Sequence, residues 1–348
     1  MYDQTPASNG AGGRYPYNHP SPYAGTPAPP RPAEKSPTRR LFVFALFAGG
    51  ALLAHLLLRR LYVEILNATV LIDYYRGSLE MSYLLETVYT LVCVGLPFLL
   101  LYLLLKTRRD LFAPLPLGGA YSGYQAFLLV FAGLGVCLAG SLLTNLFASW
   151  AAQAGFGFES YYQALEGEET PDTALGIALL VLHSAVAPAL VEEFAFRGVL
   201  LQPLRKYGDW FAILTTAVLF GLMHGNMTQM PFAVVAGIGL GYCATVTGSL
   251  WVSILIHFLN NFISVCFSFV GNVYGERASL LFSNISMYGF MGIGLLALVF
   301  YALRSPAFLR LRAGEYRGAK KLAFLLAPTM LAALGVMLWI TLQDIRFS

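Results

Sequence analysis

The sequence predicts an all-α, polytopic membrane protein with about nine transmembrane helices. Hydrophobic residues make up 57% of its 348 residues and charged residues only 11%, whereas about a quarter of the residues in a typical soluble domain are charged. The apolar runs are long, and a helix needs about 20 residues to cross the hydrocarbon core of a bilayer. A transmembrane barrel would instead show short strands of alternating polarity. We therefore expect a multi-pass helical protein of the cell membrane.

Nine apolar runs follow one another along the chain, and each is a candidate helix. The first is the weakest candidate, because Arg59 and Arg60 end it on the side where basic residues are not expected. The runs occupy about residues 41–58, 82–105, 124–150, 173–203, 209–225, 230–247, 249–270, 285–303 and 322–342.

Basic residues near the ends of the runs predict the orientation of the helices, because Lys and Arg are enriched in short cytoplasmic loops. With nine spans and a cytoplasmic N-terminus, every basic loop falls on the cytoplasmic side, and the acidic loop after the third run falls outside. The basic residues are Arg39, Arg40, Lys106, Arg108, Arg109, Arg205, Lys206, Arg304, Arg310, Arg312, Arg317, Lys320 and Lys321, and the acidic ones are Glu159, Glu166, Glu168, Glu169 and Asp172.

Residues 1–38 form a Pro-, Tyr- and Gly-rich tail that holds nine of the 18 prolines. Such a segment buries too little apolar surface to offset the entropy of ordering, so we predict that it is disordered. We divide the rest of the chain into three peripheral transmembrane helices with their loops (39–172), a core of four helices (173–270) and two C-terminal transmembrane helices (271–348).

The charge and the cysteines exclude some classes of function. The formal net charge is only +4, and no basic cluster with interleaved aromatic residues is present, so we expect no nucleic-acid partner. The four cysteines lie inside apolar runs without a CxxC spacing, which is typical of small helix residues rather than of a metal or redox site. They are Cys93, Cys137, Cys243 and Cys266.

The fourth run contains the stretch ALVEEFAFRGVL, which places three charged residues in an apolar segment. A charge near the bilayer centre costs about 2.5–3.5 kcal/mol on insertion scales, so such residues pair or have a function. Glu193 and Arg197 are four residues apart and share a helix face, which predicts an ion pair. Glu192 points about 100° away from Glu193 and needs another partner. The alternative is a structural ion pair with one extra acid.

Two later runs supply partners for Glu192. The stretch FGLMHGN ends the fifth run with His224, and IHFLNN in the seventh run gives His257. Asn261 lies one turn beyond His257 on the same face, with Asn260 as a nearby alternative. A carboxylate, two imidazoles and an amide can hold a water molecule, alone or with a metal, remove its proton and stabilise an oxyanion. Each histidine on its own would be an ordinary buried residue.

The depths of the two histidines conflict with a shared site. Counted from the cytoplasmic end at about 1.5 Å per residue, His257 lies about 12 Å deep and His224 about 22 Å deep. The two meet if the fifth helix starts late, tilts or is displaced. We assign packing or hydrogen-bonding roles to His55 and His183, the latter because it lies on the opposite side of the helix from Glu192.

These stretches resemble the motifs of the CPBP family of intramembrane proteases, which includes the type II CAAX prenyl endopeptidases and the bacterial Abi proteins. EEFAFR fits EExxxR, FGLMH fits FxxxH and HFLNN fits HxxxN, in that order on consecutive membrane helices. The resemblance covers about residues 173–270. It implies a site within the membrane that opens to the cytoplasm and a substrate that is membrane-associated or lipidated.

The resemblance implies a role for each motif residue. Glu192 corresponds to the base, and Glu193, Arg197 and Phe220 take supporting positions. His224 would help to hold the attacking water, and His257 and Asn261 would stabilise the oxyanion. The family is often described as metalloproteases, so His224 and His257 are also candidate ligands of a divalent metal such as zinc. A catalytic zinc usually has three protein ligands, and the metal stays open.

The sequence therefore predicts an intramembrane endopeptidase of the CPBP type that hydrolyses a peptide bond with a water activated by Glu192. Neither HExxH nor a Gly-x-Ser-x-Gly nucleophile elbow is present in the sequence. Two alternatives remain: a non-catalytic immunity or scaffold protein of the same fold, and a proton-coupled carrier that uses Glu192 and the histidines as a relay.

Overall fold

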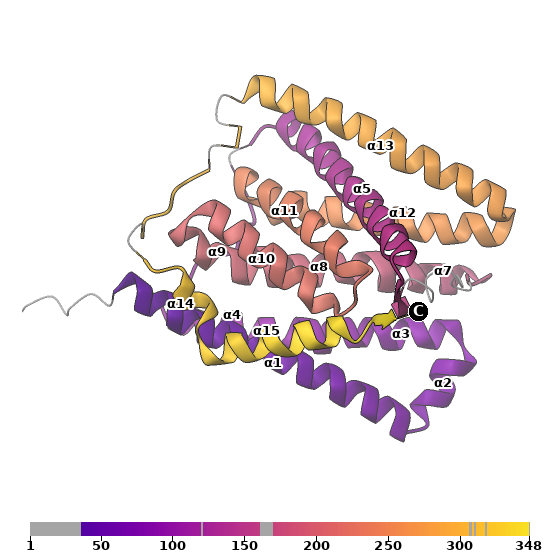
Figure 1. Ribbon diagram of the computed structural model, residues 1–348, viewed down its shortest axis with the longest axis horizontal. Coiled ribbons are helices and arrows are strands. Elements are labelled where there is room, and N and C mark those ends of the chain that lie inside the picture. The colour runs from indigo at the N-terminus through magenta and orange to yellow at the C-terminus, as the bar shows by residue number, and fades with distance from the viewer. Residues whose placement is uncertain are drawn as a thin grey trace, which may run out of the picture. The chain divides into compact units, whose positions relative to one another are not determined.

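The fold consists almost entirely of helices, as predicted (Figure 1). The computed structural model describes residues 36–119, 121–160, 170–305, 308–309, 311–316 and 319–347. The predicted tail up to residue 35, most of the acidic loop (Glu166, Glu168 and Glu169) and two basic residues, Arg310 and Arg317, lie outside these residues.

Two groups of elements follow one another along the chain. The first group is α1 (Pro37–Ala68), α2 (Leu71–Gly77), α3 (Leu79–Tyr89), the π-helical η1 (Thr90–Gly95), α4 (Leu96–Thr107), α5 (Gly123–Gln153) and β1 (Phe156–Phe158). The second is α7 (Ala174–Val181), the π-helical η2 (Leu182–Val186), α8 (Ala187–Glu193), the π-helical η3 (Phe194–Leu200), α9 (Leu201–Leu204), the 3₁₀-helical η4 (Arg205–Tyr207), α10 (Asp209–His224), α11 (Gln229–Thr247), α12 (Leu250–Tyr274), α13 (Glu276–Arg304), α14 (Leu322–Leu325), α15 (Pro328–Leu342) and β2 (Ile345–Phe347).

Seven of the described helices are long and apolar enough to cross a membrane. They are Pro37–Ala68, Leu79–Thr107, Gly123–Gln153, Ala174–Tyr207, Gln229–Thr247, Leu250–Tyr274 and Glu276–Arg304. The runs predicted at 209–225 and 322–342 form α10 and α15, which have only 16 and 15 residues and are shorter than the roughly 20 residues of a full crossing. The protein is a multi-pass membrane protein, and the count of nine spans stays a prediction.

Local sequence signals explain where several helices begin and end. Ser36 caps α1 by accepting a hydrogen bond from the Arg39 amide, and Pro37 occupies the first turn, where its missing N–H is not needed. Ser122 and Gln125 form a reciprocal capping box at the start of α5. Gly225 ends α10 in the left-handed conformation with φ of 71°, which favours glycine.

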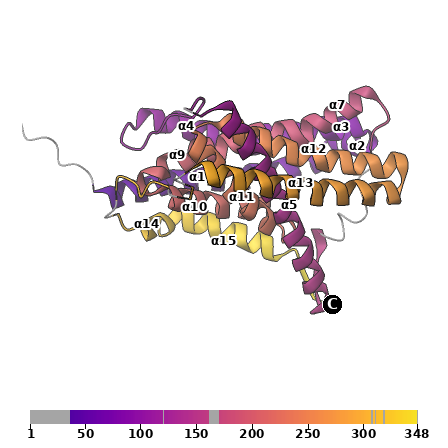
Figure 2. The same ribbon diagram turned by 90° about the horizontal axis from the view of Figure 1, so that it is seen from above.

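Close helix packing depends on glycine. In Figures 1 and 2, α5 and α13 lie side by side. A Cβ atom added to Gly294 of α13 would lie 2.7 Å from the Cα atom of Gly135 of α5. Likewise, a Cβ atom on Gly221 of α10 would lie 2.8 Å from the Met230 carbonyl oxygen of α11. Small residues at these crossings allow the backbones to approach closely, as is typical of membrane helices.

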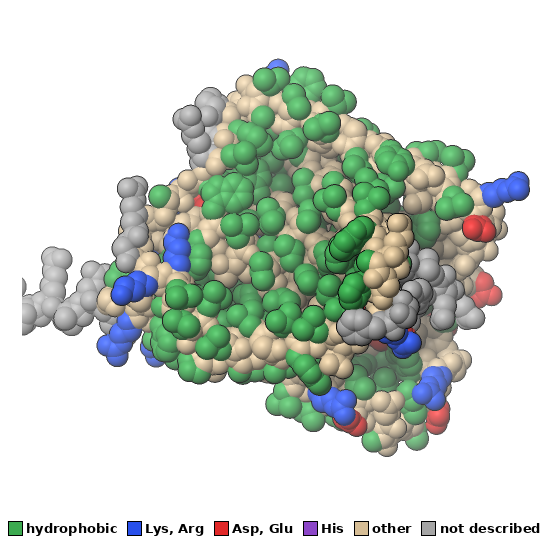
Figure 3. All heavy atoms as spheres, in the orientation of Figure 1, with side chains coloured by type: hydrophobic (Ala, Val, Ile, Leu, Met, Phe, Trp, Pro, Cys, Tyr) green, Lys and Arg blue, Asp and Glu red, His purple; other side chains and the backbone are tan. Residues whose placement is uncertain are grey.

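Hydrophobic side chains cover most of the face seen in Figure 3, as expected of a surface in contact with lipid. One cluster of buried hydrophobic residues draws on helices from all three predicted parts of the chain beyond residue 38. The division at residues 173 and 270 therefore stays a prediction.

The basic segments gather at one end of the helices, as the predicted topology requires. The Lys206 ammonium donates to the Phe112 carbonyl at 3.1 Å, Arg40 donates to the Tyr316 hydroxyl at 2.7 Å, and the Arg312 amide donates to Asp209. These contacts join the start of α1, the loop after α4, the end of η4 and the segment before α14. That this end faces the cytoplasm remains a prediction.

Candidate functional site

One cavity of about 430 Å³ contains all four predicted catalytic side chains. Glu192 comes from α8, His224 from α10, and His257 and Asn261 from α12. Phe220, predicted as a supporting residue, also lines the cavity. The other lining residues are Cys137, Ser141, Pro188, Gln229, Phe232, Ala236, Leu240, Asn260 and Ser264.

The shared cavity resolves the difference in depth between the two histidines. Counted from the start of their helices, His257 lies about 10 Å and His224 about 22 Å along the axis. Helix α11 lines the cavity from Gln229 to Leu240, a length of about 16 Å at 1.5 Å per residue. The cavity thus extends along the helices and includes both depths, so neither a late start nor a displacement of α10 is needed.

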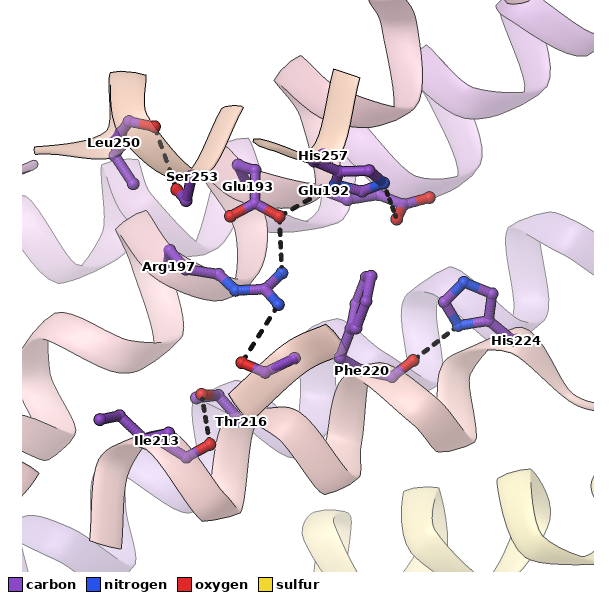
Figure 4. A network of polar contacts seen from close by, with 11 residues as sticks. Glu192, Glu193, Arg197, Ile213, Thr216, Phe220, His224, Leu250, Ser253 and His257 are labelled. Carbon is purple, nitrogen blue, oxygen red and sulfur yellow. Dashed lines mark hydrogen bonds and ion pairs between the residues drawn. The ribbon is translucent and has the colours of Figure 1, made fainter. Parts of the chain in front are cut away.

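The predicted ion pair between Glu193 and Arg197 is present and fully buried (Figure 4). The Arg197 Nη1 atom donates to Glu193 Oε1 at 2.8 Å, and the two side chains are 1% and 0% exposed. The guanidinium also donates from Nη2 to the Gly237 carbonyl at 3.5 Å and lies over the Phe220 ring, 4.5 Å from its centroid. Arg197 is thus satisfied on several sides, as a buried charge must be.

Glu193 has a second partner, which the sequence reasoning missed because it assigned this residue to Arg197 alone. The His257 Nδ1 atom lies 3.0 Å from Glu193 Oε1. An ionised carboxylate only accepts hydrogen bonds, so His257 carries a proton on Nδ1 and donates it to Glu193. This bond orients the imidazole so that its Nε2 atom lies towards Glu192, at 3.9 Å from Oε2.

Within the described part of the chain, Glu192 forms no ion pair with an arginine, and Arg197 pairs with Glu193 instead. Its side chain is 14% exposed, and the 3.9 Å separation from His257 Nε2 is longer than a hydrogen bond. Glu193 is fully buried beside it. Of the two adjacent carboxylates, the one that lines the cavity is therefore the one that can contact water or a substrate.

His224 is held by its own helix. Its Nδ1 atom lies 2.8 Å from the Phe220 carbonyl oxygen, which can only accept, so Nδ1 carries the proton and Nε2 is left for the cavity. The Phe220 ring contacts both histidines edge-on, with centroid distances of 4.9 Å to His224 and 6.0 Å to His257. Phe220 therefore spaces the two imidazoles within one cavity.

Asn260 and Asn261 act as a pair. Asn260 donates from Nδ2 to Asn261 Oδ1 at 3.1 Å, and Asn261 donates from Nδ2 to the Ser184 carbonyl at 3.1 Å. Both line the cavity, so Asn260, which the sequence offered as an alternative to Asn261, is also part of the site. Each amide group has two N–H bonds, and one of each remains for the cavity.

A proline explains why the Ser184 carbonyl is free to accept Asn261. Pro188 lies four residues after Ser184 and has no N–H with which to continue the helical hydrogen bonding. The same relation occurs away from the cavity, where Pro97 follows Cys93 by four residues and the Cys93 carbonyl accepts from His55 Nδ1 at 2.8 Å. Side chains of neighbouring helices commonly satisfy such carbonyls in membranes.

The π-helical segments on either side of α8 were not predicted. Arg197 lies within η3, and its carbonyl accepts from Gln202 Nε2 at 2.8 Å. Segments of π-helix frequently mark functional sites in helices. The prolines at 188 and 203 were the signal in the sequence that the backbone of this span departs from a regular α-helix.

A catalytic zinc usually has three protein ligands, for example two histidines and a glutamate. No group of three or more His, Cys, Asp or Glu side chains among the described residues is placed to hold a metal ion. His224 and His257 each use Nδ1 in a hydrogen bond, so only the Nε2 atom of each ring is left as a metal ligand. Glu192 would be the third ligand at the cavity. Metal binding by these histidines stays a prediction, and the chemistry derived below uses only the side chains of the chain.

The two remaining histidines of the membrane helices have packing and hydrogen-bonding roles. The His183 ring stacks on Tyr83 with centroids 5.7 Å apart, and His55 is buried against the Cys93 carbonyl. Neither is among the residues that line the cavity.

The motif-bearing segment matches a known family. Residues 174–263 match the family model described as "Type II CAAX prenyl endopeptidase Rce1-like". This segment is similar to that family. It includes every predicted site residue, from Glu192 to Asn261, and supports the resemblance found in the sequence. The match leaves α1 to α5 and α13 to α15 outside.

A curated protein gives a second, weaker similarity. The chain is 24% identical over 126 residues to the "Putative membrane peptidase YdiL" of Bacillus subtilis (strain 168), which is 34% of this chain and 52% of that protein. The match thus spans about half the length of the curated relative. No solved structure matches the chain significantly.

Proposed function

We propose that this protein is an intramembrane endopeptidase in which Glu192 activates a water molecule to hydrolyse a peptide bond. The observation that carries the proposal is the meeting of Glu192, His224, His257 and the two asparagines in one cavity between apolar helices. The Rce1-like family model and the peptidase relative support a protease.

The attacking water would lie between Glu192 and His224. The Glu192 carboxylate accepts one proton of the water, and His224 Nε2 accepts a hydrogen bond from the other, because its Nδ1 proton is committed to the Phe220 carbonyl. As the water oxygen attacks the peptide carbonyl carbon, its proton passes to Glu192, which can then deliver it to the leaving nitrogen. Atoms and charges balance without another reactant.

The oxyanion would form opposite the base. The donors would be the second N–H bonds of Asn260 and Asn261, since the first N–H of Asn260 donates to Asn261 Oδ1 and the first N–H of Asn261 donates to the Ser184 carbonyl. His257 contributes a donor at Nε2 only when doubly protonated, because Nδ1 already donates to Glu193. The buried pair of Glu193 and Arg197 fixes that imidazole in place. Preorganised donors of this kind contribute about 100- to 1,000-fold each in hydrolases.

The substrate and the accessible side of the membrane follow from the resemblance. A site between apolar helices favours a membrane-associated or lipidated peptide, which reaches the cavity without leaving the bilayer. The resemblance also implies a cytoplasmic opening, and of the two histidines in the cavity His257 is the nearer to the basic end, about 10 Å along α12 against about 22 Å for His224 along α10.

The proposal is tested with Glu192→Gln, which removes the base and retains the shape of the side chain. New protein termini in membranes are compared between wild type and variant, with His183→Phe as the control because it keeps an aromatic ring against Tyr83 outside the cavity. We expect cleavage products with wild type and His183→Phe and none with Glu192→Gln. Products that persist with Glu192→Gln would refute Glu192 as the base.

Other outcomes separate the alternative functions. If no cleavage depends on Glu192, but protection or partner binding survives its loss, the protein is a non-catalytic relative of the family. Uptake by proteoliposomes that requires both a proton gradient and Glu192 would identify a carrier.

A further inference from the structure

The segment that follows α15 contacts the turn next to His224. Asp344, which is 9% exposed, accepts three hydrogen bonds of 2.7 Å with its carboxylate. The donors are the Met227 amide, the Ser160 amide and the Ser160 hydroxyl. Bonds to an ionised acceptor are about twice as strong as neutral ones, so this carboxylate joins three parts of the chain tightly.

The turn that Asp344 holds begins directly after His224. Gly225 ends α10 with φ of 71°, and Asn226 accepts from the Gln229 amide at 2.7 Å and donates to the His224 carbonyl at 3.4 Å. Because His224 is the last residue of α10, the position of its imidazole depends on how this turn is held.

A second set of contacts holds the turn from the same side. The Thr228 hydroxyl lies 2.5 Å from the Ser160 hydroxyl, and β1 pairs antiparallel with β2 directly after Asp344. Met227 and Ile345 pack on a small cluster of buried residues that is separate from the main core (Ala148, Ala151 and Phe158). The turn is thus fixed by polar and apolar contacts that come from residues 148–160 and 344–345.

We propose that Asp344 is a positioning residue for His224: by holding the Met227 amide, it sets the end of α10 and thereby the imidazole that lines the cavity together with Glu192. This inference rests on the proposed function. Asp344 lies outside residues 174–263, so the family model assigns it no role. A displacement of about 1 Å in a catalytic group can cost about 100-fold in rate, so small movements of this turn matter.

The test uses Asp344→Asn and Ser160→Ala in full-length protein. An asparagine keeps one acceptor oxygen and cannot serve all three donors, whereas Ser160→Ala removes only the hydroxyl bonds. Arg346→Ala is the matched control. It removes an ion pair with Glu159 in the same segment, and the Arg346 side chain is 65% exposed. Hydrogen exchange of the 225–230 amides is measured beside cleavage kinetics.

We expect Asp344→Asn to lower kcat about 10- to 100-fold, with KM within about twofold of wild type because the residue does not line the cavity. We expect faster exchange of the 225–230 amides, no change in the exchange of α12, and a smaller effect of Ser160→Ala. Arg346→Ala should leave both measurements unchanged.

Two results would overturn the inference. In the first, the 225–230 amides exchange at the wild-type rate in Asp344→Asn. In the second, kcat falls only in proportion to a general loss of folded protein, with faster exchange throughout the helices. Failure of the proposed function looks different: wild type and Glu192→Gln would then cleave nothing, and the exchange measurement would still decide whether Asp344 holds the turn.

Discussion

The pairing of Pro188 with Asn261 makes a prediction that separates activity from stability. In Pro188→Ala, residue 188 regains an N–H that can donate to the Ser184 carbonyl and compete there with Asn261. The exchange replaces one hydrogen bond with another, each worth about 0.5–1.5 kcal/mol net, so the free energy of unfolding should change by about 1 kcal/mol or less. The amide of Asn261, in contrast, is free to turn away from the cavity.

We expect Pro188→Ala to lower kcat by about 100-fold, the lower end of the effect of losing one oxyanion donor. Cleavage of a membrane substrate and thermal unfolding are measured on the same preparation. Pro97→Ala is the matched control, because it restores an N–H opposite the Cys93 carbonyl and displaces His55 instead, which does not line the cavity. Full activity in Pro188→Ala, or an equal loss in Pro97→Ala, would refute the reasoning.

Three further predictions concern the buried pair, the helix packing and the opening of the cavity. Arg197→Met should lower the free energy of unfolding by about 3–5 kcal/mol, because it leaves a buried carboxylate with one partner fewer. Arg60→Met breaks an exposed pair with Glu64 and should lower the free energy of unfolding by less than about 1 kcal/mol. Gly294→Leu should separate α5 from α13, where even a Cβ atom would lie 2.7 Å from the Gly135 Cα atom, and lower the unfolding temperature. In a cysteine-free background, Ser264→Cys should react with an impermeant thiol reagent from the cytoplasmic side; reaction only from outside would contradict the predicted cytoplasmic opening of the cavity.

The sequence was sufficient for the features that depend on composition and on residue spacing. Apolar runs predicted the helices, and the spacing of four residues predicted the ion pair between Glu193 and Arg197. The motif residues Glu192, His224, His257 and Asn261 do share one cavity. These predictions succeed because a helix fixes the relation between residues three or four positions apart.

The features that were missed depend on the backbone or on distant parts of the chain. The π-helical turns arise where a proline removes a donor, and a regular α-helix was assumed there. The bond from His257 to Glu193 requires the rotation of α12 against α8, which no local pattern specifies. Asp344 accepts a hydrogen bond from Met227, which lies 117 positions earlier in the sequence. A single aspartate outside the recognised motifs does not indicate such a contact.

The place of Phe220 has a consequence for electrostatics within the site. Its ring covers the Arg197 guanidinium on one side and lines the cavity on the other. The ring thus separates a permanent cation from the cavity that Glu192 lines. Were this phenylalanine replaced by a small residue, cavity water would gain access to Arg197, and the arginine would begin to compete with the substrate for Glu192.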